Sequence, residues 1–124
     1  MTIKERLFQY PALQSEAQAL CNRLDILQEI ADIADPAELD DIERQLKANA
    51  QETKTLRNLV ASLPNPTERE ILTLRYISSA THKPTPWKDV EIKLYGSIRH
   101  NRVRSIQRYH RAALIHLDGI CCER

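Results

Sequence analysis

The chain has 124 residues, 42% of them hydrophobic and 28% charged, which is typical of a folded globular protein and argues against disorder. Aromatic residues make up only 5% and there are two glycines, which argues against a sheet-rich fold with many tight turns; we expect an all-α protein. The net charge of +1 is unevenly divided: residues 1–63 carry 7 Lys or Arg against 11 Asp or Glu, and residues 64–124 carry 11 against 6. The two halves are therefore expected to meet different partners.

An apolar stripe predicts a long helix in the first third of the chain. Its members recur at alternating steps of four and three residues, as in a helix that buries one seam against another: Leu13, Ala17, Leu20, Leu24, Leu27, Ala31 and Ala34. The helix should end near Asp35-Pro36, because a proline lacks the amide hydrogen and disfavours helical geometry in the preceding residue.

A second helix is expected to start at the same place. Asp35 can act as its N-cap, with Pro36 at the first helical position and the Glu38 carboxylate reaching back to the amide of the cap. A second stripe follows at the same spacing: Leu39, Ile42, Leu46, Asn49, Thr53, Leu56, Val60 and Leu63.

The two stripes leave several arrangements open for an N-terminal arm formed by residues 1–62. They suit an antiparallel helical hairpin or coiled-coil arms of a homodimer or higher homo-oligomer, and the second stripe can also pack onto the C-terminal half of its own chain. Asn49 either fixes the register of a buried seam or marks, with Thr53, where the seam opens to solvent.

Residues 63–124 predict three more helices. Asn65-Pro66-Thr67-Glu68 repeats the capped start and should open a helix that runs through Ile77. Thr85-Pro86-Trp87 should start the next helix in a similar way, and Tyr95-Gly96 should end it, because glycine readily adopts the left-handed conformation that closes a helix.

The last predicted helix begins between Ser97 and Asn101 and ends at about Leu117 or Asp118. Its apolar residues recur at helical spacing: Val103, Ile106, Ala113, Leu114 and Leu117.

The other face of this last helix is basic. Arg104, Arg108 and Arg111 lie at i, i+4 and i+7, and no acidic residue intervenes between Glu91 and Asp118. Like charges at this spacing destabilise a helix, and a polyanion such as DNA would relieve the repulsion. The alternative is a basic face that is merely solvated.

The order of these segments resembles a known family. Five segments in this half are similar to the helix-turn-helix of sigma-70 region 4: Leu63-Pro64, Thr67 to Leu72, Leu74 to Ile77, Trp87 to Val90 and Ile106 to Leu114. More narrowly, they resemble phage and prophage transcriptional regulators of the ArpU and RinA type. The resemblance covers about residues 63–117 and implies a three-helix DNA-binding domain behind the helical arm.

The resemblance implies that the last helix enters the major groove and that the start of the preceding helix meets the DNA backbone. The residues placed at this interface are Arg99, Asn101, Arg102, Arg104, Ser105, Arg108, Arg111, Thr85, Trp87 and Lys88. Among them Arg102, Arg104, Ser105 and Arg108 are base-reading candidates, Arg111 is expected on phosphate, and Trp87 is expected either in the core or on the DNA.

The chain departs from the family pattern at two places. The stretch from Leu94 to Ile106 is about five residues longer than usual, which leaves the start of the recognition helix open. Glu91 stands where the family usually has a small residue packed into the turn, which leaves the angle between the two helices open.

We therefore expect a cytoplasmic, sequence-specific transcriptional regulator that binds double-stranded DNA. The alternatives are a DNA-packaging subunit of the small-terminase kind and an adaptor that binds RNA polymerase. No apolar run is long enough to span a membrane, and no phosphate loop or nucleophile motif predicts an enzyme. The cysteines (Cys21, Cys121 and Cys122) and the histidines lack metal-ligand spacing, so neither a metal nor a cofactor is expected, and His110 should pack on the neighbouring helix.

Overall fold

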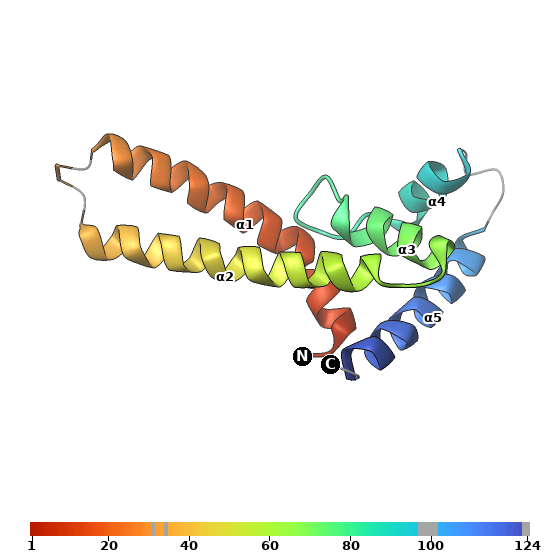
Figure 1. The fold of residues 1–124 in the computed structure, drawn as a ribbon. Helices are drawn as coiled ribbons and strands as arrows, with labels where there is room; N and C mark the ends of the chain where they lie inside the picture. The colour runs from red at the N-terminus through yellow and green to blue at the C-terminus, as the bar shows by residue number, and fades with distance from the viewer. Residues whose placement is uncertain (31, 34, 97–101, 123–124) are drawn as a thin grey trace.

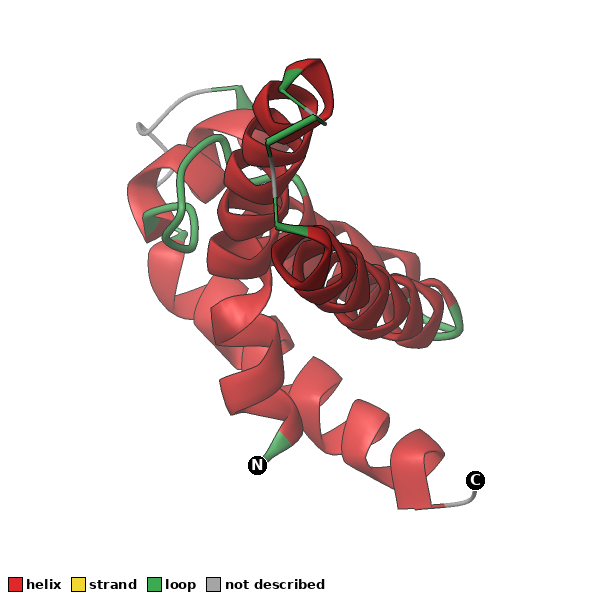
Figure 2. Cartoon of the chain, turned by 90° about the vertical axis from the view of Figure 1, so that its left-hand side faces the viewer, coloured by secondary structure: helices red, strands yellow, loops and turns green. Residues whose placement is uncertain are grey.

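The computed structural model describes residues 1–30, 32–33, 35–96 and 102–122, with the side chains of residues 121 and 122 left aside. Over these residues the chain forms helices and loops and no strand, which confirms the all-α prediction (Figure 2). In chain order the elements are α1 (Ile3–Glu29), α2 (Pro36–Ala61), α3 (Pro66–Leu72), η1 (Thr73–Ile77), α4 (Trp87–Tyr95) and α5 (Val103–Cys122). Within the described residues, no helix has the length and apolar character needed to cross a membrane.

Helix α1 starts with a reciprocal cap and ends earlier than predicted. The Thr2 hydroxyl accepts a hydrogen bond from the Glu5 amide at 3.2 Å, and the Glu5 carboxylate accepts from the Thr2 amide at 3.5 Å. Pro11 lies inside the helix and cannot donate the helical hydrogen bond. The first part of α1 runs in a different direction from the rest of the helix (Figure 1). The expected end near Asp35 is wrong, since α1 stops at Glu29 and the chain then reverses so that α2 can pack along it. Ala31 and Ala34 lie outside the described residues.

Helix α2 begins where the sequence predicts. The Asp35 side chain accepts a hydrogen bond from the Ala37 amide at 3.0 Å, with Pro36 at the first helical position. The Glu38 carboxylate accepts a hydrogen bond from Arg23 of α1. Helices α1 and α2 run side by side for most of their length (Figure 1).

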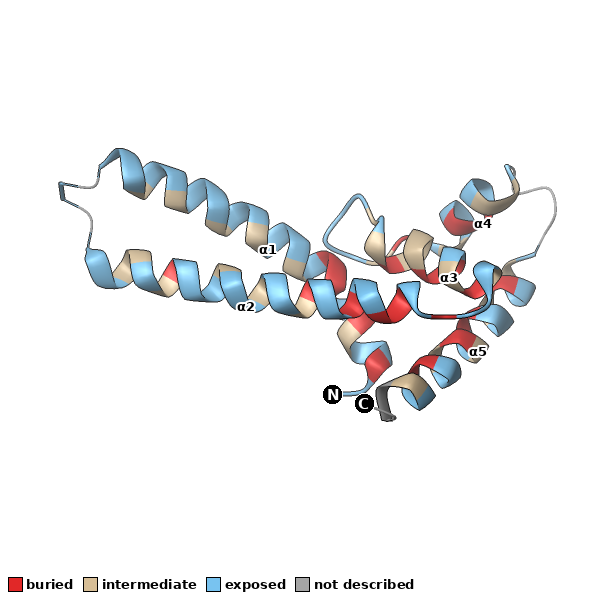
Figure 3. Cartoon of the chain, viewed as in Figure 1, coloured by how far each residue is buried: buried red, intermediate tan, exposed pale blue. Residues whose placement is uncertain are grey.

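The main core lies where the ends of α1 and α2 meet the C-terminal half of the chain. Figure 3 shows the buried residues gathered there. Leu56, Val60 and Leu63 of the second stripe are each at most 3% exposed and pack in one cluster with residues of α1, α3, η1 and α5. This part of the stripe therefore packs within its own chain, as one of the alternatives had it. Because the cluster draws on both halves, the proposed division at residues 62 and 63 stays a prediction.

The far part of the α1–α2 pair is less well buried. The first stripe from Leu13 to Leu27 is only half-buried, and Ile26 and Ile33 are 60% and 82% exposed. Asn49 is half-buried, but its Nδ2 atom is buried and has no hydrogen-bond partner in the part of the chain that the structure describes. Thr53 is buried and donates to the Ala50 carbonyl at 3.2 Å. The second stripe thus does not open fully to solvent at these two polar residues.

Helix α3 is capped as predicted and then continues as a π-helical turn. The Asn65 side chain accepts from the amides of Thr67 and Glu68 at 2.9 and 3.3 Å. The helix reaches Ile77 as predicted, but it is α-helical only to Leu72 and continues as η1, with the Ser78 amide donating to the Thr73 carbonyl at 2.8 Å.

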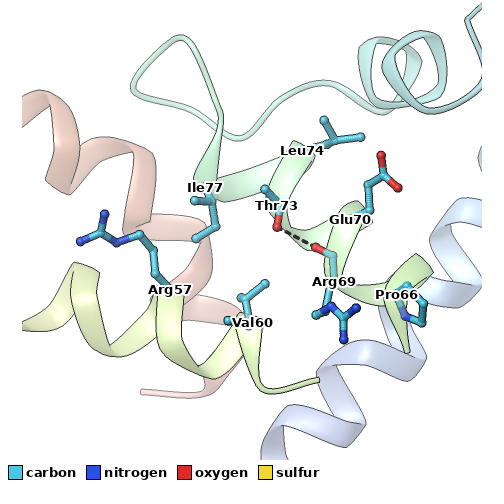
Figure 4. A pocket seen from close by; sticks show the side chains of 9 residues that line it. Arg57, Val60, Pro66, Arg69, Glu70, Thr73, Leu74 and Ile77 are labelled. Carbon is cyan, nitrogen blue, oxygen red and sulfur yellow. Dashed lines mark hydrogen bonds between the residues drawn. The ribbon is translucent and has the colours of Figure 1, made fainter. Parts of the chain in front are cut away.

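A groove of about 550 Å³ separates the end of α2 from α3 and η1. Figure 4 shows Val60 and Ile77 facing it from its two sides, with Arg57, Arg69 and Glu70 at its edges. The Thr73 hydroxyl donates to the Arg69 carbonyl at 2.7 Å, which holds the start of the π turn beneath the groove.

The connection into α4 differs from the expected cap. Pro86, not Thr85, is the N-cap of α4, and no side chain caps the helix, so the expectation of a capping Thr85 is wrong. Thr85 is engaged elsewhere, because its amide donates to the Arg75 carbonyl at 2.7 Å and its carbonyl accepts from Arg75 Nη1 at 2.6 Å. The predicted end of the helix is confirmed, since Gly96 has φ +82° and donates to the Ile92 carbonyl.

Helix α5 starts later and ends later than predicted. Arg102 is not helical, so the helix begins at Val103 rather than between Ser97 and Asn101, and it continues to Cys122. Ile106, Ala113 and Leu117 are fully buried as expected, whereas Val103 and Leu114 are half-buried.

Candidate nucleic-acid interface

The three arginines of the predicted stripe share one exposed face of α5. Arg104, Arg108 and Arg111 are all exposed, and they lie opposite the residues that bury the helix against the core. Arginine presents a planar fork of donors that binds phosphate oxygens or the edge of guanine, so a row of arginines at this spacing suits a polyanion.

The residues at the start of α5 are only partly described. Arg102 is exposed, and its guanidinium lies 5.1 Å from the centre of the Tyr95 ring, which links the start of α5 to the end of α4. Arg99 and Asn101, both predicted at the interface, lie outside the described residues.

Ser105 contributes to a shallow hollow beside the arginine stripe. The hollow has a volume of about 400 Å³ and is lined by Ser105, Arg108, Tyr109 and Ala112. Tyr109 is 42% exposed and was not among the predicted site residues. Tyr109 follows the predicted site residue Ser105 by four positions, and this helical spacing is the sequence signal that places the two on one face.

The three residues predicted at the start of α4 occupy different surroundings. Lys88 is exposed, Thr85 is only 6% exposed, and Trp87 is half-buried. The Arg75 guanidinium lies 4.0 Å from the centre of the Trp87 ring, and the rings of Trp87 and His110 meet in a T-shaped arrangement at a centroid distance of 4.9 Å. Of the three residues, Lys88 is the one whose side chain is open to an external partner.

His110 packs on its neighbouring helical elements, as predicted, against Tyr76 of η1 and Trp87 of α4. Its Nε2 atom lies 2.7 Å from the Tyr76 hydroxyl oxygen. Burial, and then the nearby charges of Arg75 and Lys4, lower the pKa of His110 to about 4. The imidazole is therefore neutral at pH 7 and can accept a hydrogen bond from Tyr76, whose own pKa is raised by burial.

A contact between the side chains of Glu68 and His116 holds α5 against α3. Glu68 is 1% exposed, and its carboxylate lies 2.7 Å from Nδ1 of His116. The sequence assigned Glu68 to the cap of α3, whereas the structure uses its side chain to position the helix that carries the arginines. Nearby, Arg69 Nη1 donates to the Leu63 carbonyl at 2.6 Å and ties α3 to the end of α2.

Glu91 is buried in α4 without compensation. It is 2% exposed, and its Oε1 atom has no hydrogen-bond partner among the described residues. A buried acceptor without a partner destabilises the fold. The Glu91 side chain is thus buried in the protein interior, at a position where the family that the sequence resembles usually has a small residue.

Among the described residues, no three histidine, cysteine, aspartate or glutamate side chains come together in a way that could hold a metal ion. Comparison of the chain with known protein families, with curated proteins and with solved structures gives no match.

Proposed function

We propose that this protein is a sequence-specific DNA-binding regulator of transcription that inserts α5 into the major groove. The observation that carries the proposal is the exposed face formed by Arg104, Arg108 and Arg111 opposite a well-packed core. An α-helix fits the width of the major groove, and arginine is the side chain that most often reads guanine there. A link to phage regulation depends on the sequence resemblance alone.

The packing of α5 supports this proposal because a reading helix must be held rigidly. Buried residues anchor it along its length, from Ile106 through His110 to Leu117. The Glu68–His116 pair adds a contact on the side of α3. The exposed arginines can therefore meet DNA from a helix whose orientation is set by the rest of the fold.

We also propose that the protein acts as a homodimer or higher homo-oligomer through its N-terminal helices. The last residues of the second stripe pack in the core of their own chain and are not free to bind a partner. The support for oligomerisation therefore comes from the end of the α1–α2 pair that lies far from this core. There the seam is half-buried and Ile26, Ile30 and Ile33 are exposed. A dimer of this kind would read two half-sites about one helical turn of DNA apart.

The test is selection of the purified protein on a random pool of DNA duplexes, followed by affinity measurements over a salt series. The variant Arg104→Ala/Arg108→Ala removes two cations from the stripe, and Arg44→Ala/Arg57→Ala removes two exposed cations from α2 as a matched control. We expect the wild type and the control to enrich one motif, and the stripe variant to lose it.

The outcome also separates the alternatives. Weak binding without a motif, equally affected by salt in the wild type and both variants, would overturn base reading by α5. Stable co-purification with RNA polymerase would then favour the adaptor. If a motif is found and the protein assembles as a ring, the DNA-packaging subunit is favoured over the regulator.

A further inference from the structure

A second basic surface lies where four elements meet. A cavity of about 370 Å³ is formed by α1, η1, α4 and α5. The lining residues that matter here are Lys4 and Phe8 of α1, Arg75 of η1, Trp87 of α4, and His110 and Arg111 of α5.

The charges in this cavity all have one sign. Lys4, Arg75 and Arg111 come from three different elements, and no carboxylate lines the cavity among the described residues. The lowered pKa of His110 agrees with this arrangement, since both Arg75 and Lys4 oppose its protonation. Three cations at one cavity without an acid create a positive potential that favours an anion.

Arg75 is the best fixed of the three cations. Its guanidinium lies over Trp87, and its Nη1 atom donates to the Thr85 carbonyl at 2.6 Å. Its Nε atom is buried and has no hydrogen-bond partner, and no carboxylate within the described part of the chain pairs with it. The charge of this guanidinium is therefore held beside the cavity without a carboxylate to neutralise it, and it can attract an external anion.

Resting on the DNA-binding function proposed above, we infer that this cavity binds a phosphate group, and that the DNA backbone supplies it. Arg111 connects the two surfaces, because it lines the cavity and also belongs to the exposed stripe of α5. When α5 lies in the major groove, a backbone phosphate beside that groove is the nearest anion. Lys4 then brings the start of α1 into the DNA interface, so that docking of the N-terminal helix contributes to DNA binding.

The first test uses inorganic phosphate as the probe and the ring signals of His110 in NMR spectra as the readout. The variant Lys4→Gln removes the positive charge of an exposed lysine that lines the cavity. The matched control is Lys47→Gln, which removes the charge of another exposed lysine, on α2. At constant ionic strength maintained with chloride, phosphate should shift the His110 signals and raise the pKa of this residue in the wild type and the control. The effect should be weaker in Lys4→Gln. No response in the wild type would overturn the phosphate site.

The second test distinguishes the DNA backbone from a small phosphorylated molecule. If the backbone supplies the phosphate, Lys4→Gln should weaken binding to all duplexes alike and lower the slope of log K against log salt by about 1, without changing the selected motif. A response to phosphate with an unchanged slope would assign the site to a small phosphorylated molecule and overturn the backbone assignment. If the wild type binds no DNA, the proposed function fails, and the phosphate titration still decides whether the cavity binds an anion.

Discussion

The hydroxyl oxygen of Tyr76 lies 2.7 Å from Nε2 of His110, and this contact joins η1 to the middle of α5. Both side chains are buried, and the Trp87 ring stands nearly perpendicular to the imidazole. The contact connects the interior of the protein with its proposed binding face, because Arg111 follows His110 directly and faces outward. The protonation of His110 should therefore affect the stability of the region that carries the arginines.

His110 should make the fold sensitive to mild acid. Well above pH 6.5 the residue is neutral in both states, but near and below pH 6.5 the unfolded chain takes up a proton that the folded chain, with a pKa of about 4, does not. Stability due to the neutral imidazole is thus lost as pH falls from 6.5 towards 4. Relative to His110→Gln, which does not titrate, the wild type should lose about 2 kcal/mol of unfolding free energy between pH 7 and 5. Denaturant unfolding at a series of pH values measures this loss. The prediction is contradicted if the unfolding free energies of the wild type and of His110→Gln change with pH in parallel.

Removing the buried carboxylate of Glu91 should stabilise the fold. Its Oε1 atom has no partner, so Glu91→Leu removes an unsatisfied acceptor and adds apolar contacts. We expect the free energy of unfolding to rise by about 1–2 kcal/mol. Asp89→Leu, at an exposed position on the same helix, should change it by less than about 0.5 kcal/mol. Thermal or urea unfolding provides the measurement, and a loss of stability in Glu91→Leu would show that the carboxylate has a structural role.

The Asn65 cap should account for a measurable part of the stability. Its side chain accepts from two backbone amides at the start of α3. Asn65→Ala should lower the free energy of unfolding by about 1 kcal/mol. Asn65→Asp keeps an acceptor oxygen, so its free energy of unfolding should stay within about 0.3 kcal/mol of the wild-type value. Equal losses in the two variants would mean that something other than capping makes Asn65 important.

Self-association should depend on the far end of the α1–α2 pair. Ile26→Ser/Ile33→Ser removes two exposed apolar side chains from the end distant from the core, and should shift the protein towards a monomer in sedimentation experiments. Ile92→Ser, at an exposed isoleucine on α4, should leave association unchanged. The proposal of an N-terminal oligomer interface does not survive if the double variant associates as the wild type does.

Several features could be read from the sequence because their causes are local. Asp35-Pro36 and Asn65-Pro66 start helices because a side-chain oxygen two or three residues away satisfies free amides, and Gly96 ends one because it tolerates a positive φ. The exposed row of arginines on α5 follows from helical periodicity alone. Each of these depends on residues within a few positions of one another.

Other features were decided only by contacts between distant parts of the chain. Helix α1 ends at Glu29 because the chain must turn back to pack α2 along it, and Thr85 is held by Arg75, ten residues earlier, rather than serving as a cap. Contacts between distant segments also decide where the second stripe packs, since its last residues are buried in the core of their own chain. Lys4 and Arg111 are 107 positions apart, so only the tertiary structure, which packs α1 against η1 and α5, places them at one cavity.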